Sequence, residues 1–208
     1  MNIKDSIILS EIDYEIIYCE HPVFYPDQFQ LSPIWSDDKE FAYSCKYCLK
    51  DYQLYLKSFT VSSDREYPVI NGVTPEPCCS VDGRETVRYH DIMESLGYTG
   101  SMIIGAFIIK TYTDSDEIPC YCYKYIKELV FSRGKLITAI DHSKAMLRIR
   151  RNLDMGLRSL DKKRDVKCIE RFIRSSFAGN YADSDKRYRR LLKKVLHRKS
   201  YFEKIKKV

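Results

Sequence analysis

The chain has little glycine, a single tryptophan and no long apolar run. Among its 208 residues there are eight glycines, and it contains neither a phosphate-binding loop nor a dinucleotide-binding fingerprint, which disfavours nucleotide chemistry. The longest apolar run, residues 102–109, fits a buried strand and is too short to cross a bilayer. The first apolar stretch is too short for a signal peptide and is followed by acidic residues, so we expect a cytoplasmic protein with no membrane partner.

The composition is that of an ordinary globular protein rich in tyrosine. Hydrophobic residues make up 44% and charged residues 31% of the chain, which is enough apolar surface for a sizeable core. The 17 tyrosines favour a large sheet content, because a tyrosine ring packs on a half-buried sheet face while its hydroxyl reaches a partner. In a chain with no export signal, the eight cysteines are expected to be free thiols.

Charge is segregated along the chain. Residues 1–143 contain 13 Lys and Arg against 22 Asp and Glu, a balance of −9, whereas residues 144–208 contain 22 against 7, a balance of +15. The overall charge of +6 therefore averages an acidic first part with a strongly basic second part.

Alternating and apolar segments of the first part predict strands joined by short turns. Asp51 lies in a predicted hairpin loop at residues 50–53, Asn71-Gly72 is a strong turn signal, and a second hairpin is predicted at residues 132–134. The region around Asn71-Gly72 is expected to be an extended loop, because it contains Pro68, Pro75 and Pro77. The predicted strands are residues 14–19, 41–49, 54–61, 102–113, 121–131 and 135–140.

After residue 141 the apolar period changes to that of a helix. Met146 and Ile149 begin a stripe on a helix that Ser143 would cap, a second helix would end near Gly179, and a third would begin at residue 183 or 184. The sequence therefore predicts an α+β fold: a mostly antiparallel, Tyr-rich sheet followed by a basic C-terminal segment of about three helices. We expect an acidic β-rich body at residues 1–142 and a basic helical tail at residues 143–208, packed together as one unit.

Four segments carry a resemblance to known sequences. They are Tyr43–Leu56 (YSCKYCLKDYQLYL), Tyr67–Pro75 (YPVINGVTP), Tyr98–Ile109 (YTGSMIIGAFII) and Tyr125–Ser143 (YIKELVFSRGKLITAIDHS). In this order they resemble a group of uncharacterised bacterial proteins, over roughly residues 41–150. The resemblance implies a shared β-rich body and brings no activity with it.

Two pairs of cysteines have spacings found in metal sites. Cys45 and Cys48 have the spacing of half a zinc site, and either Cys78-Cys79 or Cys120-Cys122 is a candidate second half. Geometry argues against this reading, because a three-residue offset on a strand places Cys45 and Cys48 on opposite faces. Cys120 and Cys122 would share one face of a strand. We therefore expect buried thiols, no bound metal and no cofactor.

A Cys/His enzyme is the catalytic alternative, although the chain carries no recognised catalytic signature. Cys78 and Cys79 follow two prolines, and a thiol exposed in such a loop would need a histidine nearby to act as a nucleophile. His90 with Asp91 is the polar pair that would serve.

The basic tail suggests a binding function. We expect a non-catalytic binding protein whose tail, centred on residues 186–199, engages nucleic acid or an acidic protein surface, since such a density of positive charge suits phosphate contacts. In the alternative, the tail binds no partner. It pairs instead with the acidic body of the same chain. The residues that would make the contacts are Lys186, Arg187, Arg189, Arg190, Lys193, Lys194, Arg198 and Lys199.

A further alternative uses the acidic body instead of the tail. In that reading the protein is an immunity-type, phage-defence or host-interaction protein that covers a basic partner with an acidic sheet face. It depends on the −9 balance of residues 1–143.

Overall fold

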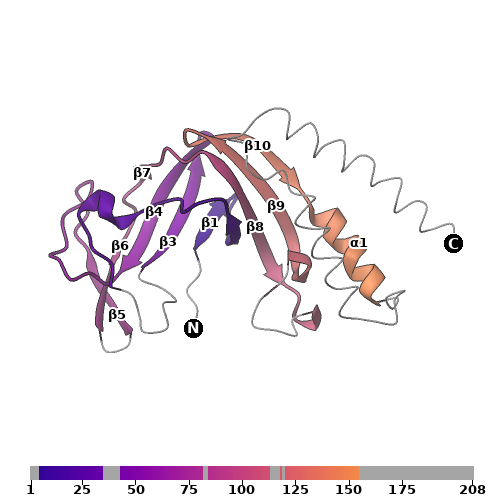
Figure 1. Ribbon diagram of the computed structural model, residues 1–208, viewed down its shortest axis with the longest axis horizontal. Coiled ribbons are helices and arrows are strands. Elements are labelled where there is room, and N and C mark those ends of the chain that lie inside the picture. The colour runs from indigo at the N-terminus through magenta and orange to yellow at the C-terminus, as the bar shows by residue number, and fades with distance from the viewer. Residues whose placement is uncertain (1–4, 35–42, 82–83, 113–117, 119, 155–208) are drawn as a thin grey trace.

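The computed structural model describes residues 5–34, 43–81, 84–112, 118 and 120–154, and strands dominate them (Figure 1). One α-helix, α1 (Ser143–Asp154), follows the last strand of this described part. The 3-10 helices in the connections are η1 (Pro26–Phe29), η2 (Lys110–Tyr112) and η3 (Cys120–Cys122). The strands are β1 (Ser6–Leu9), β2 (Ile12–Cys19), β3 (Tyr43–Lys50), β4 (Gln53–Val61), β5 (Glu76–Val81), β6 (Arg84–Tyr89), β7 (Glu94–Ser95), β8 (Gly100–Ile108), β9 (Tyr123–Ser132) and β10 (Lys135–Asp141).

These strands form one strongly curled sheet. Its order is β10-β9-β8-β2-β1-β3-β4-β6-β5, with β7 paired to β4, and the pairs are antiparallel apart from β1 with β3. The curl is large enough that β10 also pairs with β4, through Lys135 and Gln53. The Leu54 N–H donates to the Gly134 carbonyl at 2.8 Å at the same place. In Figure 1, β3, β4 and β6 form one arm of an arch and β8 and β9 the other. The sheet thus has an inner face, enclosed by the curl, and an outer face.

Tight turns with positive φ at both central residues join the strands. This geometry matches the right-handed twist of a hairpin, and the turns predicted around residues 50–53, 71–72 and 132–134 are confirmed. Gly134, with φ of +78°, also needs to be glycine for space, because a Cβ there would lie 1.8 Å from the Leu96 carbonyl oxygen. The central residue pairs are Ser10-Glu11, Asp51-Tyr52, Asn71-Gly72 and Arg133-Gly134.

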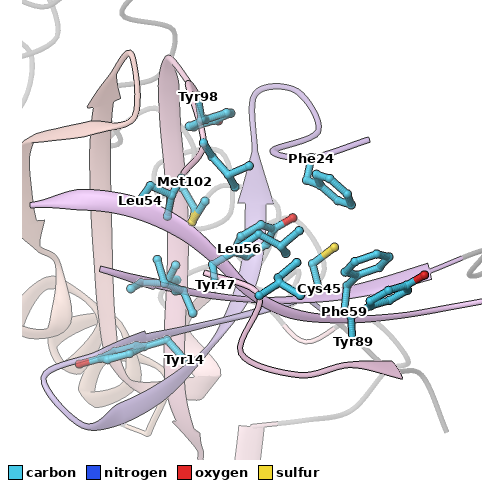
Figure 2. Packing of buried hydrophobic residues seen from close by; sticks show 14 of the residues in the cluster. Tyr14, Phe24, Cys45, Tyr47, Leu54, Leu56, Phe59, Tyr89, Tyr98 and Met102 are labelled. Carbon is cyan, nitrogen blue, oxygen red and sulfur yellow. The ribbon is translucent and has the colours of Figure 1, made fainter. Parts of the chain in front are cut away.

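The inner face carries the main hydrophobic core. Figure 2 shows side chains from different strands converging on it. The rings of Phe59 on β4 and Tyr89 on β6 stack with centroids 4.8 Å apart, and Phe24 packs against Phe59 at 5.4 Å. Burial of each such side chain stabilises the fold by roughly 1.5–3 kcal/mol. The curl therefore gives the sheet a core of its own.

Several tyrosines play the role expected from the sequence, with a buried ring and a bonded hydroxyl. The Tyr89 hydroxyl donates to the Pro68 carbonyl and the Tyr98 hydroxyl to the Ser101 carbonyl, both at 2.9 Å. Burial raises the pKa of Tyr89 to about 12. These hydroxyls stay protonated and act as structural donors at neutral pH.

Helix α1 covers the outer face of β9 (Figure 1). Met146 and Ile149, which the helical stripe predicted to be buried, are 0% and 3% exposed. The helix begins where predicted, although its cap differs: the Asp141 carboxylate accepts from the Ser143 N–H at 2.8 Å, while the Ser143 hydroxyl bonds the Ile126 N–H. In the described part of the chain, no helix is long and apolar enough to span a membrane.

The predicted fold class is wrong in its helical half. The described residues are mostly strand and contain one α-helix, so a C-terminal segment of about three helices is not supported. The second and third predicted helices fall within residues 155–208, outside the described residues. The physical reason is that the curled sheet encloses its own core, and α1 adds a cover over one part of its outer face.

Strands were also more numerous than the sequence predicted. Pro77, expected in an extended loop, lies in β5, which pairs with β6, whereas Pro75 precedes the strand. A proline is tolerated there because β5 is the last strand in the sheet order and has a free edge.

Candidate functional site

The thiol and histidine proposed for an enzyme do not come together. Cys78 lies on β5 next to Pro77, which is paired with Val87, so His90 is three residues further along the neighbouring strand, roughly 10 Å away. That separation exceeds hydrogen-bond reach. The side chain of Cys79, also on β5, lies outside the described part of the structure.

The histidine and the aspartate of that proposal have other partners. His90 Nε2 is 3.9 Å from a Glu76 carboxylate oxygen, and Asp91 Oδ1 is 3.6 Å from Lys57 Nζ. His90 and Asp91 therefore belong to a charged surface, described below, and not to a thiol centre.

The metal candidates are dispersed as well. Cys45 is buried on the inner face of β3, whereas Cys48 points to the outer face, as the three-residue offset predicted. Cys120 and Cys122 do not share a strand face, because both lie on η3; the Cys122 thiol donates to the Tyr112 carbonyl at 3.1 Å. Among the described residues, His, Cys, Asp and Glu form no group of three that could hold a metal.

The eight basic residues proposed to bind nucleic acid or an acidic partner, between Lys186 and Lys199, lie outside the described residues. Four basic residues at the start of the predicted tail are described, and Lys144 is exposed. Arg148 and Arg151 are exposed on α1, whereas Arg150 is 5% exposed and donates to the Tyr121 and Tyr123 carbonyls, at 2.8 Å each. Arg150 is therefore a structural residue and is not available to phosphate.

The outer face of β1, β3, β4 and β6 carries a groove of about 470 Å³. Strand alternation produces its lining: Cys45 and Tyr47 of β3 point into the core, so the residues between and beside them point outward. On β4, the Lys46–Ser58 pair is followed by a register shift that leaves Lys57 without a cross-strand partner. Such a bulge re-aims a side chain, and Lys57 joins the groove.

Hydroxyl groups and cations line the groove in two cross-strand rows. The rows are two residues apart along each strand, which corresponds to about 7 Å. Each row combines one basic side chain with two hydroxyls. The first row contains Ser6, Lys46 and Ser58, and the second contains Ser44, Thr60 and Arg88.

The three cations differ in their partners. Lys46 Nζ lies 2.5 Å from Asp13 Oδ2, and Lys57 Nζ lies 3.6 Å from Asp91 Oδ1. Arg88 instead donates from Nε to the Thr60 hydroxyl at 3.0 Å, and within the described residues no carboxylate is within ion-pair distance of it. The guanidinium is thus oriented and keeps its two terminal nitrogens for a ligand.

The groove is suited to binding anions. Three cations line it against one carboxylate, that of Asp91, and the row hydroxyls add further donors. The neighbouring thiols offer no nucleophile, because burial raises the pKa of Cys45 well above its ordinary value and raises that of Cys48 as well. The arrangement can hold phosphate or carboxylate groups and has no evident catalytic machinery of the kind a thiol enzyme needs.

This groove was missed by the sequence reading. Lys46, Lys57 and Arg88 are isolated basic residues of an acidic segment, and only the pairing of β3, β4 and β6 brings them together. No protein-family model, curated protein or solved structure matches the chain.

Proposed function

We propose that the protein is a non-catalytic nucleic-acid-binding protein that contacts phosphates through the groove and through its basic C-terminal segment. The observation that supports this most directly is Arg88, an oriented guanidinium without a carboxylate partner among the described residues, set in a row of hydroxyls. Phosphate oxygens are ordinary ligands of arginine forks and of serine and threonine hydroxyls.

The groove favours phosphate contacts over base contacts. Of its two ring-bearing lining residues, Phe59 is 2% exposed, and the exposed His90 ring lies 3.9 Å from a Glu76 carboxylate, so the groove offers few rings for bases to stack on. Binding through such a surface positions a nucleic-acid backbone and carries little sequence information. We therefore expect affinity for many sequences with small differences between them.

The charge distribution explains why two contact regions are needed. An acidic body repels a polyanion, and residues 1–143 carry a balance of −9. Local positive charge must offset this repulsion, first in the groove and then in residues 144–208, where the balance is +15. Lys186 to Lys199 remain the residues that we propose for the second contact region.

An acidic protein surface is the competing ligand, because carboxylates satisfy the same donors. The acidic-face alternative is less favoured at the groove itself, because three cations line it against the one lining carboxylate of Asp91, although Asp13 and Glu76 lie at its rim. Polyglutamate therefore serves as the comparison probe. Tighter binding of polyglutamate than of oligonucleotide at equal salt would favour an acidic protein partner.

The test is the salt dependence of binding, measured by fluorescence anisotropy with a labelled oligothymidylate and the full chain. Affinity should fall steeply between 50 and 200 mM salt, and Arg88→Gln should weaken binding about tenfold and reduce the salt slope by about 0.7. Arg65→Gln is the matched control, because Arg65 is exposed and does not line the groove. The combined change R189E, R190E, K193E and K194E should abolish binding.

Two results would contradict the proposal. One is an affinity that does not change between low and high salt. The other is an equal loss of affinity in Arg88→Gln and Arg65→Gln, which would mean that only the total charge of the chain matters and that the groove is not a contact surface.

A further inference from the structure

Two of the three groove cations are occupied by carboxylates of the chain itself. Asp13 comes from β2 and pairs with Lys46, whereas Asp91 comes from the segment after β6 and pairs with Lys57. Arg88 is the cation that no described carboxylate reaches. The groove therefore has one open position and two covered ones.

The Asp91 carboxylate is held beside Lys57 by the backbone. The N–H of Ile92, the next residue, donates to the Lys57 carbonyl at 2.9 Å, which fixes this segment against β4. Asp91 has a φ of 50°, in the left-handed region, as does Met93 with 49°. Asparagine and aspartate adopt this region more readily than other non-glycine residues, so the local backbone suits an aspartate here. The pair is thus a built feature of the fold.

Both ion pairs are weak enough to be exchanged. The side chains of Lys57 and Asp91 are 36% and 72% exposed, and those of Lys46 and Asp13 are 38% and 51% exposed. Exposed pairs of this kind contribute little to stability, because water screens them. An incoming phosphate can therefore replace either carboxylate without a large rearrangement.

We propose that Asp13 and Asp91 are internal competitors that make the groove selective for a chain of adjacent phosphates over isolated anions. This rests on the function proposed above. A first phosphate binds at Arg88, and neighbouring phosphates of the same strand then displace the two carboxylates from Lys46 and Lys57. The rows, about 7 Å apart, suit successive phosphates of an extended single strand. A small anion such as inorganic phosphate gains Arg88 alone and cannot displace both carboxylates at once.

The test removes a competitor without removing a cation. Asp91→Asn should bind oligothymidylate roughly two- to fivefold more tightly, because it releases Lys57 from an exposed pair. Its salt slope should steepen by about 0.7, the increment for one more phosphate on a single strand. Asp13→Asn should add a similar, independent factor through Lys46.

Asp51→Asn is the matched control. Asp51 is also exposed, also carries a left-handed φ of 51°, and lies in the β3–β4 turn away from the groove lining. It removes the same charge from the same kind of backbone position. A change of less than twofold is expected for this variant.

A double-mutant cycle separates competition from a general change in charge. In a chain that already carries Lys57→Met, Asp91→Asn should give no more than the gain of Asp51→Asn, because there is no lysine to release. Inorganic phosphate, titrated by calorimetry in the absence of oligonucleotide and at constant ionic strength, should bind the Asp13→Asn, Asp91→Asn double variant more tightly than the unchanged protein.

The outcomes distinguish this inference from the proposed function. Equal gains in Asp91→Asn and Asp51→Asn, with Arg88→Gln still weakened, would overturn the competitor role and leave nucleic-acid binding intact. Persistence of the Asp91→Asn gain in the Lys57→Met chain would also overturn it. An unchanged protein that shows no salt-dependent binding would overturn both.

Discussion

The outer face of this sheet has two regions. Strand alternation produces both, but one is covered by a helix and the other is not. Over β9, α1 covers the face, and Ile103 and Ile126 are buried against Met146 and Ile149. Over β3, β4 and β6 no described element covers the face, and the outward positions hold hydroxyls and cations in a groove. Period-two alternation therefore predicts which side chains point away from the core. Whether these side chains are buried in the fold or remain accessible to a ligand depends on whether another element packs over them.

Charged side chains show the difference most clearly. In the covered region, the guanidinium of Arg150 on α1 donates hydrogen bonds to two carbonyls of its own chain. Arg88, in the open region, has one described bond and keeps the rest of its donors. Glu128, 0% exposed below α1, is matched by His142 at 3.1 Å, whereas Asp91 in the groove is 72% exposed and weakly paired. A buried charged side chain needs a partner, whereas an exposed one can exchange its partner for another.

The largest effect is expected from Met146→Ala, which tests whether α1 is an integral cover. Met146 is 0% exposed in the cluster with Ile126, so its truncation should leave a cavity and lower the free energy of unfolding by about 2–5 kcal/mol. Urea denaturation followed by circular dichroism measures this. Leu147→Ala is the matched control, because Leu147 is 41% exposed and should cost less than about 1 kcal/mol. Equal effects of the two variants would mean that α1 does not cover the sheet.

A smaller effect is expected for Asp5, the buried carboxylate beneath the open region. Burial raises its pKa from 3.8 to about 6, although the Cys45 N–H, donating at 2.8 Å, and the Tyr47 hydroxyl lower it. A raised carboxyl pKa means that the folded state binds more protons than the unfolded state between these values. The contribution of Asp5 to stability is therefore fully present below pH 3.8 and is lost as the pH rises to about 6, by about 3 kcal/mol.

Asp5→Asn checks this sign. The amide oxygen can still accept from the Cys45 N–H, and no charge is buried. The variant should gain stability relative to the unchanged protein as the pH rises from about 4 to 7, measured as the difference in free energy of unfolding. Asp27→Asn, at an exposed position of η1, should show a constant difference. A constant difference for Asp5→Asn as well would show that the carboxyl is not desolvated.

The sequence predicted the local features of this fold better than its layers. The turns at Asp51, Asn71 and Gly134, and the buried face of Met146 and Ile149, depend on neighbouring residues and were recognised correctly. Of the three C-terminal helices predicted, the described residues contain α1, and an apolar stripe by itself indicates amphipathicity and not the number of helices in a fold. Strand β5 was missed because Pro75 and Pro77 argued for a loop, whereas Pro77, which lies in the strand, is tolerated at the edge of the sheet.

The groove could not be predicted for a different reason. Its cations are far apart in the chain, and the bulge that presents Lys57 shifts the register of β4 by one residue. Alternation counted from the buried Leu54 and Leu56 places Lys57 on the outer face, whereas alternation counted from Phe59 and Val61 places it on the inner face, so alternation alone gives no single answer for Lys57. The charge asymmetry pointed to anion binding, but it pointed to the tail and not to the sheet.

The smallest expected effect separates position from charge at the open face. In Thr60→Val the side chain keeps its size and loses the hydroxyl that accepts from Arg88 Nε at 3.0 Å. The guanidinium then samples more orientations, and oligothymidylate affinity should fall about two- to threefold, while the free energy of unfolding changes by less than about 0.5 kcal/mol. Thr60→Ser, which keeps the acceptor, should bind like the unchanged protein.

The salt slope makes this last comparison decisive. Thr60→Val leaves the charge of the groove unchanged, so its slope should equal that of the unchanged protein, whereas Arg88→Gln should lose about 0.7 because one phosphate contact disappears. A reduced slope in Thr60→Val would mean that the phosphate contact itself is lost, and an unchanged affinity would mean that Arg88 needs no support. Either result would contradict the difference between the two regions. Hydrogen bonds in the covered region stabilise the fold, whereas those in the open region orient a cation toward a ligand.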